Sequence, residues 1–288
     1  MAREARSGRR PRPPGARPRA AGSDRSIPVR KRWGQHFLAS PETARRIAGA
    51  AGLAPGETAL EVGPGDGALT RELAVRAERL LAVEIDPRRA ARLEAAFAGD
   101  ARVRVLRGDV LDRPFAAWLA EAGFPGPAVL VANLPYNAAT PIVTQALEEP
   151  EAVARAVVTV QREVARRMIA RPGDAAYGYL SVRATSAAEG RILFDLPPGA
   201  FRPAPRVVSS VVAFTPRDPA LDPDLRRRAL RIASFAFRMR RKTLANALGA
   251  LAPRGFWLEA LAAMGRGPFA RAEELALEDY LALAARLP

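Results

Sequence analysis

The stretch Glu61-Val-Gly-Pro-Gly-Asp-Gly-Ala-Leu-Thr70 decides how this chain folds. It begins with the last two residues of the run Thr58–Val62, which has the composition and length of a buried strand. It leads into residues 67–77, whose apolar side chains have helical spacing. Its glycines allow the backbone to turn sharply and to lie against a ligand, because no Cβ stands in the way. The pattern predicts a strand, a ligand-binding loop and a helix; the alternative is an ordinary glycine-rich turn.

The same alternation of strand-like and helix-like segments continues along the chain. Further strands are expected at residues 80–84, 103–106, 128–132, 156–160, 191–196 and 207–214. Helices are expected between the earlier strands, at residues 41–51, 87–97, 114–122 and 139–148. Such alternation predicts an α/β fold, a largely parallel sheet with helices on both faces. After Pro216 the pattern becomes helical, with helices expected at residues 225–237, 243–251 and 278–287.

Three parts of the chain follow from these patterns. Residues 1–27 are rich in Pro, Arg and Gly and predict a disordered basic tail. Residues 28–216 form the α/β domain, and residues 217–288 form a small all-helical domain. The tail is either an arm that grips RNA without sequence preference or, as we favour, a solvated extension.

Composition excludes several kinds of site. The 288 residues include no Cys and one His, so a disulfide framework, a Cys nucleophile and a Cys- or His-rich metal centre are excluded, and no metal is expected. No apolar run is long enough for a membrane span, and the N-terminus lacks the apolar core of a secretory signal. We therefore expect a cytoplasmic protein without a membrane partner.

The charge is strongly positive, at +15, from 45 basic and 30 acidic residues. Arg and Lys gain free energy from the counterions that a nucleic acid releases, so a polyanionic partner is favoured over a simple compositional bias. One basic cluster, Arg238, Arg240, Arg241 and Lys242, is predicted to begin the second helix of the helical domain. Cations at a helix N-terminus oppose the helix dipole, which favours RNA-phosphate binding over a merely solvated helix start.

Acidic residues at the next two strand ends indicate an adenosine-containing cofactor. Glu84 follows Gly63 by about the spacing at which a carboxylate accepts hydrogen bonds from ribose hydroxyls. Asp86 precedes a proline and is expected to cap the next helix. Asp109, at the third strand end, could accept a hydrogen bond from an adenine amino group.

The loop itself narrows the choice of cofactor. No Lys-Ser or Lys-Thr follows the glycines, which excludes a P-loop, and the spacing is not that of the dinucleotide fingerprint. The acids Glu61 and Asp66 suit cationic S-adenosylmethionine better than a pyrophosphate. The alternative is an NAD-linked oxidoreductase.

The fourth strand ends in Asn133-Leu134-Pro135-Tyr136, an amide and an aromatic rather than a charge. The lone pair of an adenine amine is delocalised into the ring, so the amine is a poor nucleophile. If the Asn133 oxygen and the carbonyl of Leu134 or Pro135 accept its two N–H bonds, the nitrogen moves toward tetrahedral geometry and can attack a methyl donor. Tyr136 offers a face on which an extruded base can stack. The alternative is a turn with a structural Asn.

Taken in order, these segments resemble the ribosomal RNA adenine N6-methyltransferase family. The resemblance rests on residues 30–38, 61–70, 83–86, 108–110, 133–137, 160–168, 171–182, 201–210 and 240–248. It implies a Rossmann-like S-adenosylmethionine-dependent methyltransferase sheet with cofactor contacts at His36, Leu38, Gly63, Glu84, Asp109 and Asn133. It also implies that Phe201 sandwiches the target base against Tyr136; the alternative for Phe201 is a core side chain.

The branch of the family that the chain resembles most dimethylates two adjacent adenosines in the 3′-terminal hairpin of small-subunit (16S) ribosomal RNA. The resemblance thus implies an rRNA-binding enzyme of ribosome biogenesis, acting within a partly assembled 30S subunit and expected to be a monomer. Tyr177-Gly178 and the segment Arg241–Leu248 favour this branch. The alternatives are a resistance methyltransferase acting on large-subunit (23S) RNA and a non-catalytic RNA-binding assembly factor.

Overall fold

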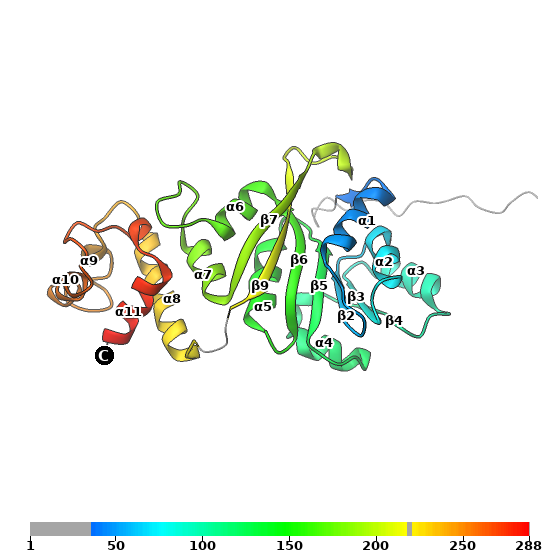
Figure 1. Cartoon of the computed structure of the whole chain (residues 1–288), viewed down its shortest axis with the longest axis horizontal. Coiled ribbons are helices and arrows are strands. Elements are labelled where there is room, and N and C mark those ends of the chain that lie inside the picture. Colours follow the sequence, from blue (N-terminus) through cyan, green and yellow to red (C-terminus); the bar gives the residue numbers. More distant parts are fainter. Residues whose placement is uncertain (1–35, 218–220, 288) are drawn as a thin grey trace, which may run out of the picture.

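The computed structural model describes residues 36–217 and 221–287 (Figure 1). The predictions for the tail, residues 1–27, and for the basic residues before Gln35 lie outside these ranges. In Figure 1 the sheet and its helices occupy one end of the long axis, and the helices α8–α11 occupy the other. Within the described residues, no helix combines the length and the apolar character needed to cross a membrane.

One seven-stranded sheet has the strand order β4-β3-β2-β5-β6-β9-β7. Its strands are β2 (Thr58–Val62), β3 (Arg79–Glu84), β4 (Val103–Arg107), β5 (Ala128–Asn133), β6 (Val153–Gln161), β7 (Ala188–Leu196) and β9 (Ser209–Pro216). Strands β2 to β6 are parallel, whereas β9 runs antiparallel to both β6 and β7. The short strands β1 (Phe37–Leu38) and β8 (Phe201–Arg202) form a separate antiparallel pair.

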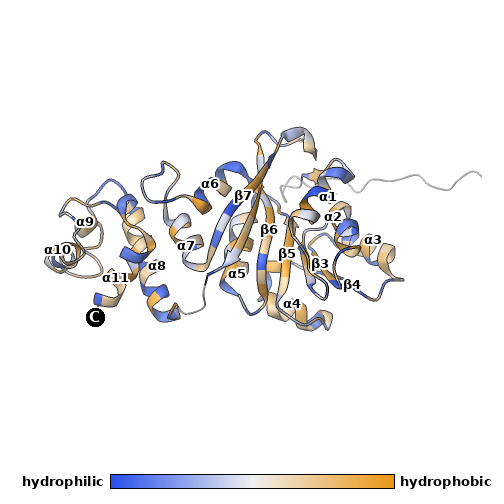
Figure 2. Ribbon diagram, viewed as in Figure 1, coloured by the Kyte–Doolittle hydropathy of each residue, from blue (hydrophilic) through white to orange (hydrophobic). Residues whose placement is uncertain are grey.

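Helices cover both faces of the sheet, as expected for the α/β fold. They are α1 (Pro41–Ala50), α2 (Ala68–Ala74), α3 (Pro87–Phe97), α4 (Phe115–Ala122), α5 (Ala139–Glu148), α6 (Arg162–Ile169) and α7 (Tyr179–Ala187). Successive strand residues alternate between two cores: Leu60 packs with α4 to α7, and its neighbour Ala59 packs with α1 and α2. Figure 2 shows β5 and β6 largely in the hydrophobic colour, as burial on both faces requires.

The helix starts follow from local capping chemistry. The Ser40 hydroxyl accepts a hydrogen bond from the Thr43 N–H, and Pro41 occupies the first position of α1. As predicted, the Asp86 carboxylate caps α3 by accepting from the Arg88 N–H. Gly67, at φ +79°, makes the left-handed turn that leads from the glycine loop into α2. The strand, loop and helix predicted from residues 58–77 are therefore confirmed.

The C-terminal helices build their own core against α7. They are α8 (Pro223–Arg238), α9 (Leu244–Ala247), α10 (Arg254–Ala263) and α11 (Leu277–Arg286). Their fully buried Trp257 and Tyr280 share one cluster with Tyr177 and Val182, which precede or belong to α7. The Tyr177 hydroxyl also donates to the Leu275 carbonyl, so the core extends across the domain boundary that the sequence predicts.

The expected position of the basic cluster is wrong. Arg238 is the last residue of α8, and Arg240, Arg241 and Lys242 lie in the turn before α9. The helix predicted for residues 243–251 is only one turn long, Leu244–Ala247, with Thr243 at its N-cap position. Cations at the C-terminal end of α8 interact favourably with its dipole, so the dipole penalty does not apply.

Candidate functional site

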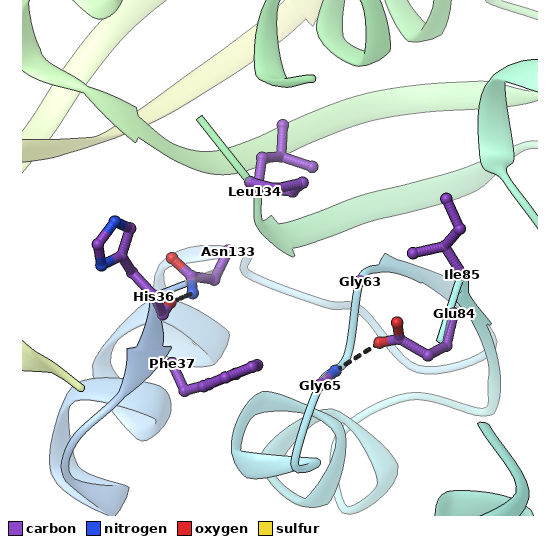
Figure 3. Close-up of a pocket in the computed structure, with 9 residues that line it drawn as sticks. His36, Phe37, Gly63, Gly65, Glu84, Ile85, Asn133 and Leu134 are labelled. Carbon is purple, nitrogen blue, oxygen red and sulfur yellow. Dashed lines mark hydrogen bonds between the residues drawn. The ribbon is translucent and has the colours of Figure 1, made fainter. Parts of the chain in front are cut away.

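A pocket lies at the carboxyl ends of β2, β3 and β5, where an α/β sheet binds ligands (Figure 3). Nine residues line it: His36, Phe37, Gly63, Gly65, Glu84, Ile85, Asn133, Leu134 and Pro135. Four of the predicted cofactor residues therefore meet in one place, although they come from three strand ends and from the segment before β1. None of the nine lining residues is an Arg or a Lys.

Glu84 is held rigidly by the backbone around it. One of its oxygens accepts the Gly65 N–H at 2.9 Å (Figure 3), and the other accepts the Asp86 N–H at 2.9 Å. Burial raises the pKa of Glu84, and these two hydrogen bonds oppose that rise. Because each oxygen has further lone pairs, the carboxylate can still accept hydrogen bonds from a ligand.

The glycine loop lies against the segment before β1. Gly65 has φ +59°, and a Cβ at this position would come 2.6 Å from the Phe37 ring. A Cβ on Gly63, at φ +67°, would meet Pro135 at 3.8 Å. Both positions thus favour glycine for their backbone conformation, and at Gly65 the close approach of Phe37 adds a second reason, whereas 3.8 Å at Gly63 is ordinary van der Waals contact.

A second, more apolar hollow continues the pocket. It shares Gly63, Ile85 and Pro135 with the first hollow, and its other lining includes Val110 and Asp109. Asp109 uses one oxygen to accept the Leu111 N–H at 3.0 Å. The arrangement suits a flat apolar ring whose edge meets a carboxylate.

Asn133 has a defined amide orientation. Its Nδ2 donates to the His36 carbonyl at 2.8 Å (Figure 3). A carbonyl can only accept, so the NH₂ group must face His36 and the Oδ1 atom is left as an acceptor. The peptide that follows, at Leu134, is buried against the sheet, which fixes the corner of the motif.

Tyr136 and His36 join three segments at the edge of the pocket. Their rings stack with centroids 5.1 Å apart and an interplanar angle of 30°. The Tyr136 hydroxyl lies 2.6 Å from Ser209 Oγ, and burial raises its pKa. His36 Nδ1 donates to the Pro203 carbonyl at 2.7 Å. One face of the Tyr136 ring is therefore already in contact with an aromatic side chain.

Leu38 and Phe201 do not line either hollow. They face each other across the β1–β8 pair, and both pack into the core cluster beneath α1 and α2. Only 2% of Phe201 is exposed, so in this conformation its ring is a core side chain. The cofactor contact of Leu38 and the base-stacking role of Phe201 stay predictions, and the second requires the β1–β8 pair to move.

The basic cluster lies elsewhere, at the C-terminal end of α8. Arg240 pairs with Glu273 at 2.5 Å, and the Arg238 guanidinium lies 5.5 Å from the centre of the Phe235 ring. Arg241 and Lys242 are exposed. The structure does not bring this cluster into the pocket, and its RNA-binding role stays a prediction.

Sequence reasoning missed Phe37, Ile85 and Ser209. Ile85 lines both hollows although it is 38% exposed, and an isoleucine directly after a strand-end acid could have indicated an apolar ligand. Phe37 is adjacent to a predicted contact. No sequence pattern pointed to Ser209, because its partner Tyr136 is 73 positions away in the sequence.

Glu61 is a buried acid beside the glycine loop, at 2% exposure. Burial raises its pKa to about 8; the Thr70 hydroxyl and Arg71 oppose that rise, and Glu84 adds to it. Neither Glu61 Oε2 nor Thr70 Oγ1 makes a hydrogen bond of good geometry with a described residue. Burial therefore favours the uncharged form of this carboxyl at neutral pH, and Glu61 lines neither hollow of the pocket.

This pKa predicts a pH-dependent stability. The folded-state pKa exceeds the ordinary value of 4.5, so the folded protein holds the Glu61 proton more tightly than the unfolded chain does. The contribution of this proton to the free energy of unfolding is complete below about pH 4.5 and is lost as pH rises to about 8. Glu61→Gln cannot ionise, so its free energy of unfolding relative to wild type should increase over that window by up to about 4 kcal/mol. Urea unfolding between about pH 5 and pH 9 measures this difference. Parallel pH profiles for the two proteins would contradict the assignment.

Comparison with known proteins identifies the family. A family model described as ribosomal RNA adenine dimethylase matches residues 28–287. The ribosomal RNA small subunit methyltransferase A of Rubrobacter xylanophilus is 43% identical over 266 residues, which cover 92% of this chain and 97% of the relative. The protein of the same name from Synechococcus sp. (strain JA-3-3Ab) is 42% identical over 265 residues, with 88% and 91% covered.

Solved structures agree in fold. The crystal structure of the 23S rRNA methyltransferase ErmE has a TM-score of 0.66 at 30% identity and covers 87% of this chain and 99% of its own. A dimethyladenosine transferase from Plasmodium falciparum has a TM-score of 0.74 at 23% identity, with 86% and 96% covered. Since the family model spans both the pocket and the C-terminal helices, this chain belongs to the ribosomal RNA adenine dimethylase family.

Proposed function

We propose that the chain transfers methyl groups from S-adenosylmethionine to the N6 atoms of two adjacent adenosines in the 3′-terminal hairpin of small-subunit ribosomal RNA. The observation that carries this proposal is the fixed amide of Asn133, whose Oδ1 remains an acceptor at the mouth of the cofactor pocket because Nδ2 is held by the His36 carbonyl. The curated relatives, at 42% and 43% identity, carry the small-subunit name.

The pocket residues fit S-adenosylmethionine. Glu84 would accept the ribose hydroxyls, and Asp109 with Ile85 and Val110 would hold the adenine ring. Glu61, which the sequence suggested for the cationic end of the molecule, is buried behind the glycine loop and lines neither hollow, so this contact stays a prediction. The glycine loop has the spacing Gly-x-Gly-x-Gly and not that of the dinucleotide fingerprint, which argues against the NAD alternative.

The chain's own residues prepare the amine for attack. Asn133 Oδ1 and a carbonyl of the Leu134-Pro135 corner accept the two N–H bonds of the target amine and aim its lone pair into the pocket. The cofactor supplies an electrophilic methyl group. Catalysis then rests on orientation and on preorganised acceptors, and no general base is needed before attack.

Tyr136 supports the extruded base by stacking. Tyr136→Ala should lower kcat/KM on RNA by roughly 5- to 150-fold, the equivalent of about 1 to 3 kcal/mol of stacking. Tyr136→Phe keeps the ring and loses only the contact with Ser209, so it should retain most of the activity. Equal kinetics for Tyr136→Ala and wild type would rule out the stacking role.

The choice between ribosomal RNAs is tested by mass spectrometry of both rRNAs from cells with and without the gene. We expect N6,N6-dimethyladenosine at two adjacent positions of the small-subunit RNA only when the gene is present. Modification of large-subunit RNA instead would support the resistance-type alternative, and unchanged RNAs would support a non-catalytic assembly factor. We further propose that the protein acts as a monomer in the cytoplasm on a partly assembled 30S subunit.

A further inference from the structure

A second groove lies far from the pocket, between α7, α8 and the last residue of α5. The motif Asn133–Tyr136 precedes the start of α5, whereas Glu148 at its end borders this groove. A ten-residue helix is about 15 Å long, so the two sites lie at opposite ends of α5. The groove is lined by five arginines: Arg183, Arg226, Arg227, Arg231 and Arg238.

The two arginines at the inner end of the groove, Arg183 and Arg226, share a single carboxylate, that of Glu148. Arg183 makes two hydrogen bonds with Glu148, at 2.9 and 3.0 Å, and Arg226 Nη2 lies 3.5 Å from the same group. This Nη2 atom is buried and makes no hydrogen bond with a described residue, and burial lowers the pKa of Arg226. Two guanidinium groups thus share one carboxylate, so the inner part of the groove keeps a net positive charge.

The outer arginines form an exposed stripe along one face of α8. The stripe consists of Arg227, Arg231 and Arg238. Their spacings of four and seven residues place all three on the same side of α8, over a length of about 16 Å. Arg227 has an exposed pair with Asp224, whereas Arg231 makes no ion pair or hydrogen bond within residues 36–217 and 221–287. Figure 2 shows hydrophilic stretches along this helix.

Two aromatic side chains lie among these cations. Tyr179 from α7 and Phe235 from α8 are half-buried in the groove, and the Arg238 guanidinium lies over the Phe235 ring. A positive track with interleaved aromatic faces is the arrangement that holds a nucleic-acid backbone and stacks its unpaired bases. A row of guanidinium groups also matches the repeating charge of phosphates better than the scattered charge of an acidic peptide.

We propose that the groove between α7 and α8 is a second RNA-binding surface, which grips the phosphate backbone of the rRNA at a distance from the target adenosine. The proposal rests on the proposed function for the identity of the RNA. Arg238 joins the groove to the turn that carries Arg241 and Lys242, so one continuous basic surface follows α8.

The test uses the full chain and the double variant Arg227→Gln/Arg231→Gln. Affinity for protein-free small-subunit rRNA is measured from about 50 to 200 mM salt. We expect roughly tenfold weaker binding and a log–log salt slope reduced by about 1.4, since each contact to single-stranded RNA contributes about 0.7. The matched control is Arg104→Gln, which removes an exposed arginine from the distant edge strand β4 and should bind like wild type.

Unchanged affinity and slope in the double variant would overturn the proposal. A loss seen only on particles that carry ribosomal proteins would also overturn it, because the partner would then be a protein. Methyl transfer by the wild type is assayed separately. If the wild-type protein transferred no methyl group but bound rRNA through these arginines, the proposed function would be refuted and the proposed RNA-binding groove would still be supported.

Discussion

Replacing Asn133 with alanine is expected to lower the rate of methyl transfer by about 10²- to 10³-fold, the usual effect of losing one preorganised polar contact to the reacting group. The variant loses the Oδ1 acceptor, so one N–H of the target amine has no partner and its lone pair stays delocalised. S-adenosylmethionine affinity should fall only modestly, because Glu84 and the glycine loop keep their own contacts. Single-turnover transfer of a labelled methyl group to RNA, together with calorimetric cofactor binding, separates the two effects.

Asn246→Ala provides a matched control, since this exposed side chain lies in α9 and, within residues 36–217 and 221–287, its amide oxygen accepts a hydrogen bond from Arg254 alone. It should transfer methyl groups at the wild-type rate. If Asn133→Ala retained wild-type turnover, the amide would have no part in activating the amine. If it lost cofactor binding in proportion to turnover, its role would be to hold the segment at His36 in place.

Replacing Glu84 with glutamine is expected to weaken S-adenosylmethionine binding by roughly 10²-fold or more. Each carboxylate oxygen accepts a backbone N–H, from Gly65 and from Asp86, and a glutamine must turn its NH₂ group toward one of these donors. The result is a buried clash of two donors beside the glycine loop, and the loss of a charged acceptor costs about 1.5 to 3 kcal/mol per bond. Isothermal titration measures the change in Kd.

Glu94→Gln is the corresponding control, because Glu94 is an exposed glutamate of α3. Its Kd should equal that of wild type. Thermal unfolding of Glu84→Gln must accompany the titration to show that the variant is folded at the temperature used. A folded Glu84→Gln protein with wild-type affinity would show that this carboxylate does not hold the ribose.

The sequence predicted the sheet and its helices well, because these depend on local patterns. The bounds of β2, α3 and α5 are those that hydrophobic spacing indicated, and Asp86 caps α3 as its place before a proline suggested. The three acid- or amide-bearing strand ends meet at one edge because parallel strands bring their carboxyl ends together. That rule placed Gly63, Glu84 and Asn133 in one pocket without any knowledge of side-chain packing.

Other features depend on contacts between distant segments and could not be read from the sequence. The bond from Asn133 to His36 joins residues 97 positions apart, and the contact between Tyr136 and Ser209 spans 73. Phe201 is buried in the core beneath α1 and α2, among residues from distant segments, and no local pattern shows this. The end of the helix at residues 225–237 was predicted to within one residue, but the basic cluster was assigned to the start of the next helix, which begins only at Leu244 and is a single turn.

The most direct test of the proposed chemistry is a crystal structure of the chain with an S-adenosylmethionine analogue and an adenosine from the target RNA. The arrangement described above predicts that Asn133 Oδ1 lies about 3 Å from the adenine N6, with its Nδ2 still bonded to the His36 carbonyl. An Asn133 amide turned away from N6, with the adenine held by other groups, would contradict it.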